Sequence, residues 1–332
     1  MPQSIQQLLI RDTAILGSSL VLDVGSARIE VQSLMQHVLR VPRAYLLAHP
    51  ERILTGPEQA GHDELLQRRL HGEPLAYILG EREFYGLTFK VTAATLIPRP
   101  ETELLVDLAL QRIPQTPLTA PPIIRQGGLV AMSPVIPPTG KGDPKSVREN
   151  NFRVLDLGTG CGAIALSIAN ARPDAEVIAV DASAAALVVA RENAEYLLQS
   201  LHSGANQQGL ASHIANLCLF QSDWFEKLAA QRFDLIISNP PYIAANDPHL
   251  QRGDLRFEPP SALASGDDGL NDIRRIISDA PAHLHPGGWL MLEHGFDQSV
   301  SVRRLLQQAG LNELFSVCDL AGIERVSGGQ LA

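Results

Sequence analysis

The sequence has little of several features that would assign it to a particular class of protein. It has three cysteines among 332 residues, with no Cys-x-x-Cys and no cysteine–histidine ligand spacing, which argues against a disulfide framework and against a structural zinc site. No apolar run approaches the roughly 18 residues of a transmembrane helix, and the first residues do not form a basic leader with an apolar core. These absences predict a cytoplasmic protein with reduced thiols, no membrane attachment and no metal site.

Basic charge is also scarce. The chain has 27 Lys and Arg against 36 Asp and Glu, a net charge of −9. Residues 151–332 carry 12 basic and 21 acidic side chains, so this segment alone accounts for the total. Negative charge repels phosphate groups, so direct binding of nucleic acid by this half is not expected. Hydrophobic residues make up 45%, which is enough for real cores, and the length fits two domains.

Proline and glycine divide the chain. Eight of the 23 prolines lie in residues 112–150, together with four glycines and five basic side chains against two acidic ones. This composition cannot sustain a long helix or a central strand, so we expect a linker or a large exposed loop there. Before it, residues 1–82 have apolar side chains at the helical period, which predicts a small helical bundle. The aromatic and β-branched pattern of residues 83–95 predicts a β-hairpin.

Strand and helix signals alternate in residues 151–332. Short apolar segments at 153–157, 176–180, 217–221, 233–238 and 289–293 predict strands, and helical signals lie at 163–171, 183–198, 270–283 and 298–309. This alternation is typical of a parallel sheet covered on both faces by helices. Ligands of such sheets bind beyond the carboxyl ends of the strands, so the chemistry is expected there.

The first motif that carries chemistry is VLDLGTGCG, residues 154–162, where a strand ends in a glycine-rich turn that opens a helix. Glycine lets the backbone turn tightly and approach a ligand closely. The spacing differs from the dinucleotide fingerprint. Asp156 in this turn would repel a pyrophosphate, but it can accept hydrogen bonds from an ammonium group. The motif therefore predicts a cofactor cradle.

Two further residues suggest which cofactor this is. Asp181 ends the next strand and is placed to accept hydrogen bonds from ribose hydroxyls, a feature that NAD sites share. Trp224, in the segment SDW after the third strand, can pack its indole on adenine. The combined spacing favours S-adenosylmethionine. The alternatives are a helix-start carboxylate for Asp181 and ordinary core packing for Trp224.

The sharpest motif is NPPY, residues 239–242, which directly follows the apolar segment FDLIIS. Its prolines fix the backbone just beyond a strand, so Asn239 and the carbonyl of Pro240 are held where the sheet meets its ligand. An amide or exocyclic amine nitrogen is a poor nucleophile because its lone pair is delocalised. Two fixed acceptors can bind its N–H groups and aim it at a methyl donor, with Tyr242 as a flat wall. The alternative is a proline-rich turn without function.

Together with other segments, these motifs resemble the protein-(glutamine-N5) methyltransferases that modify peptide chain release factors, the HemK/PrmC family. The resemblance covers nearly the whole chain. Its segments are EPLAYILGEREFYGLTF (73–89), TLIPRPETE (95–103), DLGTGCGAIAL (156–166), QSDWF (221–225), SNPPYI (238–243), FEPPSAL (257–263), DGL (268–270), PGGWLMLEHG (286–295), DLAG (319–322) and ERV (324–326). This combination is much more specific than NPPY alone.

The resemblance implies an α/β architecture in three parts. These are a five-helix substrate-recognition domain at residues 1–82, a β-hairpin linker at 83–97 and a seven-stranded Rossmann-like class I methyltransferase domain at 98–332. It also implies methyl transfer from S-adenosyl-L-methionine, leaving S-adenosyl-L-homocysteine, to the side-chain amide nitrogen of glutamine in the Gly-Gly-Gln motif of class I release factors. That modification modulates translation termination. The expected partner is thus a protein, and the enzyme is expected to be a monomer.

The resemblance assigns residue roles by matching position. Cofactor contacts are expected from Gly158, Thr159, Gly160, Cys161, Gly162, Asp181, Trp224 and Asn239. Catalytic roles are expected for Asn239, Pro240 and Tyr242, and the substrate amide is expected to be held by Asn239, Pro240, Pro241 and Tyr242. Arg99 and Glu101 lie in a segment that the family places near the substrate mouth.

Two stretches depart from the pattern of the family. Residues 112–150 replace a short connection, and residues 200–215 resemble another small insertion, but neither interrupts a site motif. Near the end, Gly328-Gly329-Gln330 happens to spell the substrate motif. We interpret this as a coincidence, because nothing in the sequence predicts that it folds as the release-factor loop does.

Three other functions fit part of the pattern. A DNA adenine-N6 methyltransferase would bind the same kind of nitrogen, but it needs a base-flipping surface and a basic groove, which the acidic half of the chain disfavours. A methyltransferase for a glutamine of a large-subunit ribosomal protein is related, although PRPETE at 98–103 favours the release-factor branch. A binding module without catalysis is disfavoured by the intact Asn239 and Tyr242.

Overall fold

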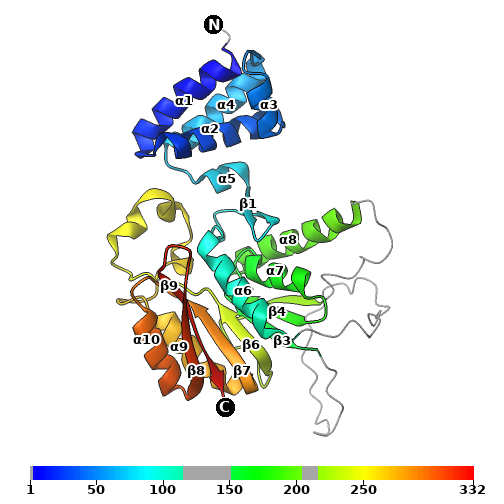
Figure 1. Ribbon diagram of the computed structural model, residues 1–332, viewed down its shortest axis with the longest axis vertical. Helices are drawn as coiled ribbons and strands as arrows, with labels where there is room; N and C mark the ends of the chain where they lie inside the picture. The colour runs from blue at the N-terminus through cyan, green and yellow to red at the C-terminus, as the bar shows by residue number, and fades with distance from the viewer. Residues whose placement is uncertain (1–2, 115–150, 204–215) are drawn as a thin grey trace.

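The computed structural model describes residues 3–114, 151–203 and 216–332 (Figure 1). The two predicted insertions, at 112–150 and 200–215, lie almost entirely outside the described residues. In the described part of the chain, no helix is long and apolar enough to cross a membrane.

Helices fill the first part of the chain. They are α1 (Ile5–Leu20), α2 (Val24–Leu39), α3 (Arg43–Ala48), α4 (Gly56–Leu70) and α5 (Leu75–Leu79). Ser4 and Thr55 begin α1 and α4 with capping boxes, in which each side chain and a residue three positions on satisfy each other's backbone N–H groups. The apolar faces close two small cores around Met35 and Leu34. The predicted helical bundle is confirmed.

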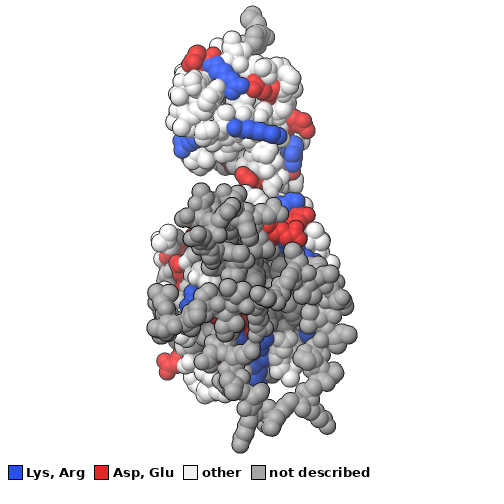
Figure 2. All heavy atoms as spheres, turned by 90° about the vertical axis from the view of Figure 1, so that its right-hand side faces the viewer, with Lys and Arg blue, Asp and Glu red and all other residues white. Residues whose placement is uncertain are grey.

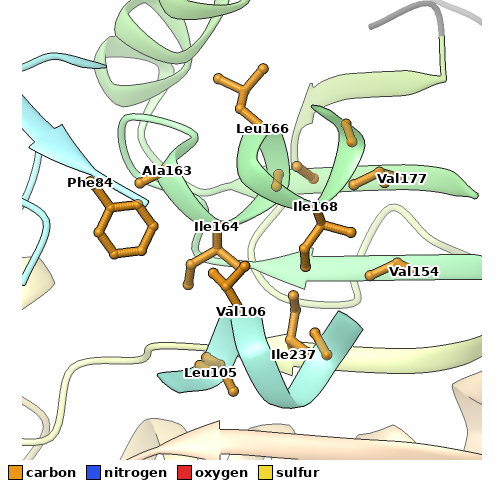
Figure 3. Packing of buried hydrophobic residues seen from close by; sticks show 14 of the residues in the cluster. Phe84, Leu105, Val106, Val154, Ala163, Ile164, Leu166, Ile168, Val177 and Ile237 are labelled. Carbon is orange, nitrogen blue, oxygen red and sulfur yellow. The ribbon is translucent and has the colours of Figure 1, made fainter. Parts of the chain in front are cut away.

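A β-hairpin leads from this bundle to the rest of the chain. Strands β1 (Glu81–Phe84) and β2 (Leu87–Lys90) pair antiparallel across Tyr85 and Gly86, which both have positive φ, as a tight two-residue hairpin turn requires. The predicted hairpin is confirmed, although it begins at Glu81 and ends at Lys90 rather than spanning residues 83–95. Figure 3 shows Phe84 of this hairpin beside Ala163 and Ile164, which belong to the same core as the main sheet.

A short 3₁₀ helix, η1 (Pro100–Thr102), and helix α6 (Glu103–Arg112) follow the hairpin, and the main sheet comes next. Its strands are β3 (Arg153–Leu157), β4 (Glu176–Asp181), β5 (Leu217–Gln221), β6 (Phe233–Ser238), β7 (Leu284–Glu293), β8 (Leu311–Cys318) and β9 (Glu324–Leu331). The strand order is β5-β4-β3-β6-β7-β9-β8, and the predicted seven-stranded sheet is confirmed.

The alternation of strands and helices predicted a sheet that is parallel throughout, and this prediction is wrong at one edge. The five strands β5, β4, β3, β6 and β7 run parallel to one another, but β9 runs antiparallel to both β7 and β8. No helix separates β8 from β9 in the chain, so this pair can return directly as a hairpin. The Gly-Gly-Gln tripeptide at 328–330 lies within β9 and pairs with β7 and β8, so it is part of the sheet rather than a loop.

Helices cover both faces of the sheet (Figure 1). They are α6, α7 (Ala163–Ala171), α8 (Ala184–Ser203), α9 (Asn271–His283) and α10 (Ser299–Gln308). Residues of α6, α7 and α8 share one core with the hairpin, and those of α9 and α10 share the other. Successive side chains of β3 point alternately into the two cores, since Val154 belongs to the first core and Leu155 to the second. The sheet therefore stands between two cores, with its strand ends available for a site.

The segment between β6 and α9 returns to the helical bundle. It contains the 3₁₀ helices η2 (Pro248–Gln251), η3 (Gly253–Phe257) and η4 (Pro260–Ala262). The Arg69 guanidinium, almost buried in the bundle, donates to Asp254 at 3.1 Å, and Arg256 donates to the carbonyl of His71 at 3.0 Å. These contacts tie the bundle to the loop that follows NPPY.

Candidate active site

A cavity of about 270 Å³ opens at the carboxyl ends of the parallel strands. Seven of the eight residues predicted to contact the cofactor line it: Gly158, Thr159, Gly160, Cys161, Asp181, Trp224 and Asn239. The eighth, Gly162, is the N-cap of α7, where an added Cβ would come 2.8 Å from the Leu166 side chain. The structure thus brings together residues at or just beyond the carboxyl ends of β3, β4, β5 and β6 that are distant in sequence.

The glycine-rich turn forms an open cradle on one wall of the cavity. Gly158 and Gly160 have φ of 74° and 58°, which glycine adopts without strain. The backbone N–H groups of Gly158 and Thr159 both donate to the Val180 carbonyl, at 2.9 and 3.0 Å, so the turn is fastened to β4. A Cβ placed on Gly160 would meet no atom within 4 Å. That open space lets a ligand approach the backbone.

Asp181 joins the cradle to the next helix. Its Oδ2 accepts a hydrogen bond from Gly160 N and its Oδ1 from Ser183 N, both at 2.8 Å. Ser183 in turn caps α8 by accepting from Ala186 N at 3.2 Å, as the sequence predicted. Burial raises the pKa of Asp181, and the two backbone hydrogen bonds oppose the rise. Each oxygen keeps a further lone pair, so Asp181 can both start the helix and accept from ribose hydroxyls.

Trp224 forms another wall. Its indole lies against the turn, 3.2 Å from the position of a Cβ on Gly158, and its Nε1–H donates to Asp272 Oδ1 at 3.2 Å. The other oxygen of Asp272 accepts from the Ser265 hydroxyl at 2.6 Å. The indole is thus held by a hydrogen bond and also packs at the edge of a core, so its two interpretations are compatible.

Trp224→Phe is expected to weaken cofactor binding about three- to tenfold, because it removes one net hydrogen bond and part of the stacking surface. Isothermal titration with S-adenosylhomocysteine measures this change. Trp289→Phe, which alters an indole packed on Phe315 away from the cavity, is the matched control. Equal affinities of Trp224→Phe and wild type would contradict the role of the indole.

Asp156 lies behind the cradle and does not line the cavity. It is fully buried, its Oδ2 accepts from the Thr159 hydroxyl at 2.7 Å, and its Oδ1 has no partner among the described residues. Burial raises its pKa to about 7. Its clearest role here is therefore to hold the turn, not to contact an ammonium group directly.

Stability is expected to fall as the pH rises through the range where buried acids titrate. Burial raises the pKa of both Asp156 and Glu293 to about 7, so the native protein keeps protons that the unfolded chain has already released. Asp156→Asn removes one of these groups. The decrease in Tm between about pH 5 and about pH 8 should become smaller than in wild type. Asp267→Asn, at an exposed position, is the control, and an unchanged decrease in Asp156→Asn would contradict the assignment.

The NPPY residues divide between the cavity and its support. Asn239 and Pro241 line the cavity, whereas Pro240 is buried. Asn239 Nδ2 donates to the Thr102 hydroxyl at 3.1 Å, and no hydrogen bond from the described residues reaches its Oδ1. The Tyr242 hydroxyl donates to Glu293 Oε1 at 3.2 Å, so the tip of its ring is directed to the interior. Gln298 Nε2 holds the Tyr242 carbonyl at 2.9 Å.

An ion pair between Arg99 and the buried Glu258 lies beside the cavity. Glu258 is only 3% exposed, and its carboxylate accepts from the Ile97 N–H at 3.0 Å and from the Arg99 guanidinium. Arg99 itself lines the cavity. These two contacts of Glu258 therefore fix the segment after the hairpin against the loop that follows NPPY.

Sequence reasoning did not assign a role to four residues that the structure places around the site: Thr102, Glu258, Asp272 and Glu293. Three of them lie inside segments that carried the resemblance, which was the available signal. The contacts that place them around the site join residues 48 to 161 positions apart in the chain, so no local pattern identifies these contacts.

The cavity fits S-adenosylmethionine on three observations. The open backbone at Gly160 can take a ligand without a Cβ in the way, Asp181 offers acceptors for hydroxyls, and the Trp224 indole provides a flat surface. Within the described ranges, no group of three or more His, Cys, Asp or Glu side chains could hold a metal ion.

Comparison with known proteins places the chain in a family. The PrmC N-terminal domain matches residues 17–80, and the methyltransferase small domain matches residues 145–252. A release factor glutamine methyltransferase of Bordetella pertussis is 46% identical over 313 residues, covering 94% of this chain and 98% of that protein. Proteins of the same name from Xylella fastidiosa (strain Temecula1) and Vibrio cholerae are 44% and 43% identical, covering 91% and 92% of this chain and 93% and 90% of theirs. The chain therefore belongs to the release factor glutamine methyltransferase family, whose members use S-adenosylmethionine.

Proposed function

We propose that this protein methylates the side-chain amide nitrogen of the glutamine in the Gly-Gly-Gln motif of class I release factors, and so modulates translation termination. The observation that carries the proposal is the amide of Asn239, which shares one cavity with the glycine-rich cradle and keeps its Oδ1 as a free acceptor. The family and the full-length similarity to release factor glutamine methyltransferases support the same substrate.

Asn239 and Pro240 bind and orient the substrate amide in the proposed reaction. The cofactor supplies an electrophilic methyl group on its sulfonium sulfur. Asn239 Oδ1 and the Pro240 carbonyl bind the two N–H groups of the substrate amide, which holds the planar nitrogen in one orientation. Pro241 lines the cavity beside them. Tyr242 anchors the segment through the hydrogen bond from its hydroxyl to Glu293. No strong general base is required, because the amide nitrogen becomes acidic once it has been alkylated.

The cofactor is held by the residues that form the cradle. Asp181 accepts from the ribose hydroxyls, Trp224 packs on the adenine, and the turn from Gly158 to Gly162 lets the ligand lie on the backbone. Thr159 and Cys161 belong to this turn and line the cavity, and the Cys161 side chain is buried. The product is S-adenosylhomocysteine.

Charge disfavours the rival that acts on DNA. Figure 2 shows Lys and Arg interspersed with Asp and Glu over the helical bundle, on the described part of that face. Several cations of the helical bundle are paired, as in Arg52–Glu58, Arg68–Glu73 and Arg69–Glu30. A nucleic-acid groove needs unpaired positive charge along the backbone path. We therefore propose a protein partner, no direct nucleic-acid binding, and a monomer acting in the cytoplasm, where its three free thiols stay reduced.

A labelling assay tests the substrate. The protein is incubated with methyl-labelled S-adenosylmethionine and a release factor, either wild type or with Gln→Ala in its Gly-Gly-Gln motif. Label is expected in the wild-type release factor alone. Equal label in both forms would refute the proposal. In parallel reactions that contain ribosomal protein or duplex DNA in place of the release factor, label in the ribosomal protein would support the related glutamine methyltransferase, and label in the DNA would support the adenine methyltransferase.

A further inference from the structure

We infer that Arg99 binds the carboxylate at the methionine end of S-adenosylmethionine, and that the buried Glu258 is the positioning residue that holds the Arg99 guanidinium in place. This role rests on the placement of adenine and ribose in the proposed function, but not on the identity of the methylated substrate. Arg99 belongs neither to the glycine-rich turn nor to NPPY. It lies in the segment between the hairpin and η1.

The charges that line the cavity do not suit every part of this cofactor equally. S-adenosylmethionine carries hydroxyls and an ammonium group, for which acceptors are suitable, but it also carries one carboxylate. The described lining residues include three acids, Asp181, Asp223 and Asp272, and a single cationic side chain, that of Arg99. A carboxylate that leaves water needs hydrogen-bond donors, and a charged donor binds it most strongly. Arg99 is the lining side chain that supplies both charge and donors.

The order of the strands places Arg99 at the correct end of the cofactor. Trp224 follows β5, Asp181 ends β4 and Asn239 follows β6, and the sheet order is β5-β4-β3-β6 at this edge. With the adenine on Trp224 and the ribose on Asp181, the methionine chain is directed across β3 toward Asn239. Asn239 Nδ2 donates to the Thr102 hydroxyl at 3.1 Å, and Thr102 N donates to the Arg99 carbonyl at 3.1 Å. The segment that carries Arg99 therefore lies where the methionine end is expected.

Glu258 holds the guanidinium without using all of its donors. Its carboxylate is fully shielded from solvent and accepts from Arg99 Nη2 and, at 3.0 Å, from the Ile97 N–H. Arg99 Nε and Nη1 have no acceptor among the described residues, and 28% of the Arg99 side chain is exposed. The guanidinium presents its donors in a fixed planar fork, so a second carboxylate can bind the free N–H groups. Because Glu258 already holds Arg99, less conformational freedom is lost on binding.

Three ligands that differ only at the methionine end test this assignment. S-adenosylhomocysteine has both the carboxylate and the ammonium group, decarboxylated S-adenosylhomocysteine keeps only the ammonium group, and 5′-methylthioadenosine has neither. Arg99→Gln is expected to weaken the binding of S-adenosylhomocysteine about ten- to hundredfold, because hydrogen bonds between two charged groups are lost. Its affinity for the other two ligands should fall by less than about twofold. Isothermal titration measures all three affinities.

Arg303→Gln is the matched control. Arg303 lies on α10, pairs with Glu324 and has a side chain that is 32% exposed, but it does not line the cavity. This variant should bind all three ligands as wild type does. A loss of S-adenosylhomocysteine affinity below twofold in Arg99→Gln would overturn the inference. An equal loss for all three ligands would also overturn it, because such a loss indicates a structural role alone.

A second pair of variants separates binding from folding. Arg99→Gln leaves the buried Glu258 carboxylate without its cation, which destabilises the fold. The double variant Arg99→Gln/Glu258→Gln removes both charges, so its Tm should be closer to that of wild type, while the selective loss of S-adenosylhomocysteine affinity persists. Recovery of that affinity in the double variant would overturn the role of Arg99. Glu258→Gln alone should cause a smaller but equally selective loss, and wild-type affinity in this variant would overturn the role of Glu258.

Turnover distinguishes cofactor binding from substrate binding by Arg99. Arg99→Gln should raise the KM for S-adenosylmethionine and leave the KM for the release factor unchanged. A raised KM for the release factor, with unchanged affinities for the three ligands, would assign Arg99 to the protein substrate and overturn the inference. If wild-type protein leaves the release factor unlabelled, the proposed substrate is wrong, while the three titrations still decide the role of Arg99. Trp224→Phe should weaken 5′-methylthioadenosine, which tests the placement of the adenine separately.

Discussion

Asn239→Ala is expected to lower kcat by about 10²- to 10³-fold while changing the affinity for S-adenosylhomocysteine only slightly. The substitution removes Oδ1, the side-chain acceptor at the carboxyl end of β6, and leaves the Pro240 carbonyl to hold the substrate amide alone. It also leaves the Thr102 hydroxyl without its partner at 3.1 Å, but it does not touch the cradle or Asp181. The loss should therefore appear in the transfer step.

Single-turnover kinetics with a release factor, together with calorimetric titration of S-adenosylhomocysteine, separate the two effects. Asn246→Ala, an exposed residue on the loop after NPPY, is the control and should behave as wild type. Asn239 also lines the cavity, so a small change in cofactor affinity is compatible with its role. If affinity and kcat fell by the same factor, Asn239 would be a cofactor residue and the catalytic assignment would be wrong.

Gly160→Val should weaken the binding of S-adenosylhomocysteine by about 5- to 150-fold or more. A β-branched residue at φ of 58° costs about 1–3 kcal/mol, which corresponds to about 5- to 150-fold in affinity if the turn relaxes out of its binding conformation. The added side chain also projects into the open space in front of the cradle, where no protein atom lies within 4 Å of the Cβ. Protein folding should thus survive the change better than cofactor binding does.

Gly310→Val provides a matched control. Gly310 follows α10, has φ of 82° and likewise has no atom within 4 Å of an added Cβ, but it does not line the cavity. Both variants should lower Tm, because both force valine into the left-handed region. Only Gly160→Val should lose affinity for the cofactor product. Equal affinities in the two variants would show that the cradle does not hold the ligand.

Several parts of the fold are predictable from local patterns. The helical bundle follows from apolar periodicity and from capping residues such as Ser4 and Thr55, which act within one turn of their own helix. The strands of the sheet up to β7 follow from short apolar segments, and the hairpin from its change of period. Local patterns did not predict β8 and β9, and the antiparallel direction of β9 contradicts the predicted parallel sheet, because strand direction depends on pairing between segments rather than on either segment alone.

The site shows the same division. The glycine-rich turn and NPPY are continuous in sequence, and their position after a strand is itself a local property, so they were found without the structure. Thr102, Asp272 and Glu293 were not assigned, because their importance lies in contacts across the fold. Asp156 was predicted to lie in the turn, but the structure places it within β3, just before the turn, and buries it behind the lining.

By itself, then, the sequence determined the division into a helical part and a sheet, the glycine-rich turn after β3, and the NPPY segment that follows β6. Tertiary structure alone decided which way Tyr242 is directed, what holds the indole of Trp224, and what lies behind the amide of Asn239. The physical reason is that turns and caps satisfy backbone groups over a few residues, whereas the orientation of a side chain is set by donors and acceptors that only folding brings within hydrogen-bonding distance.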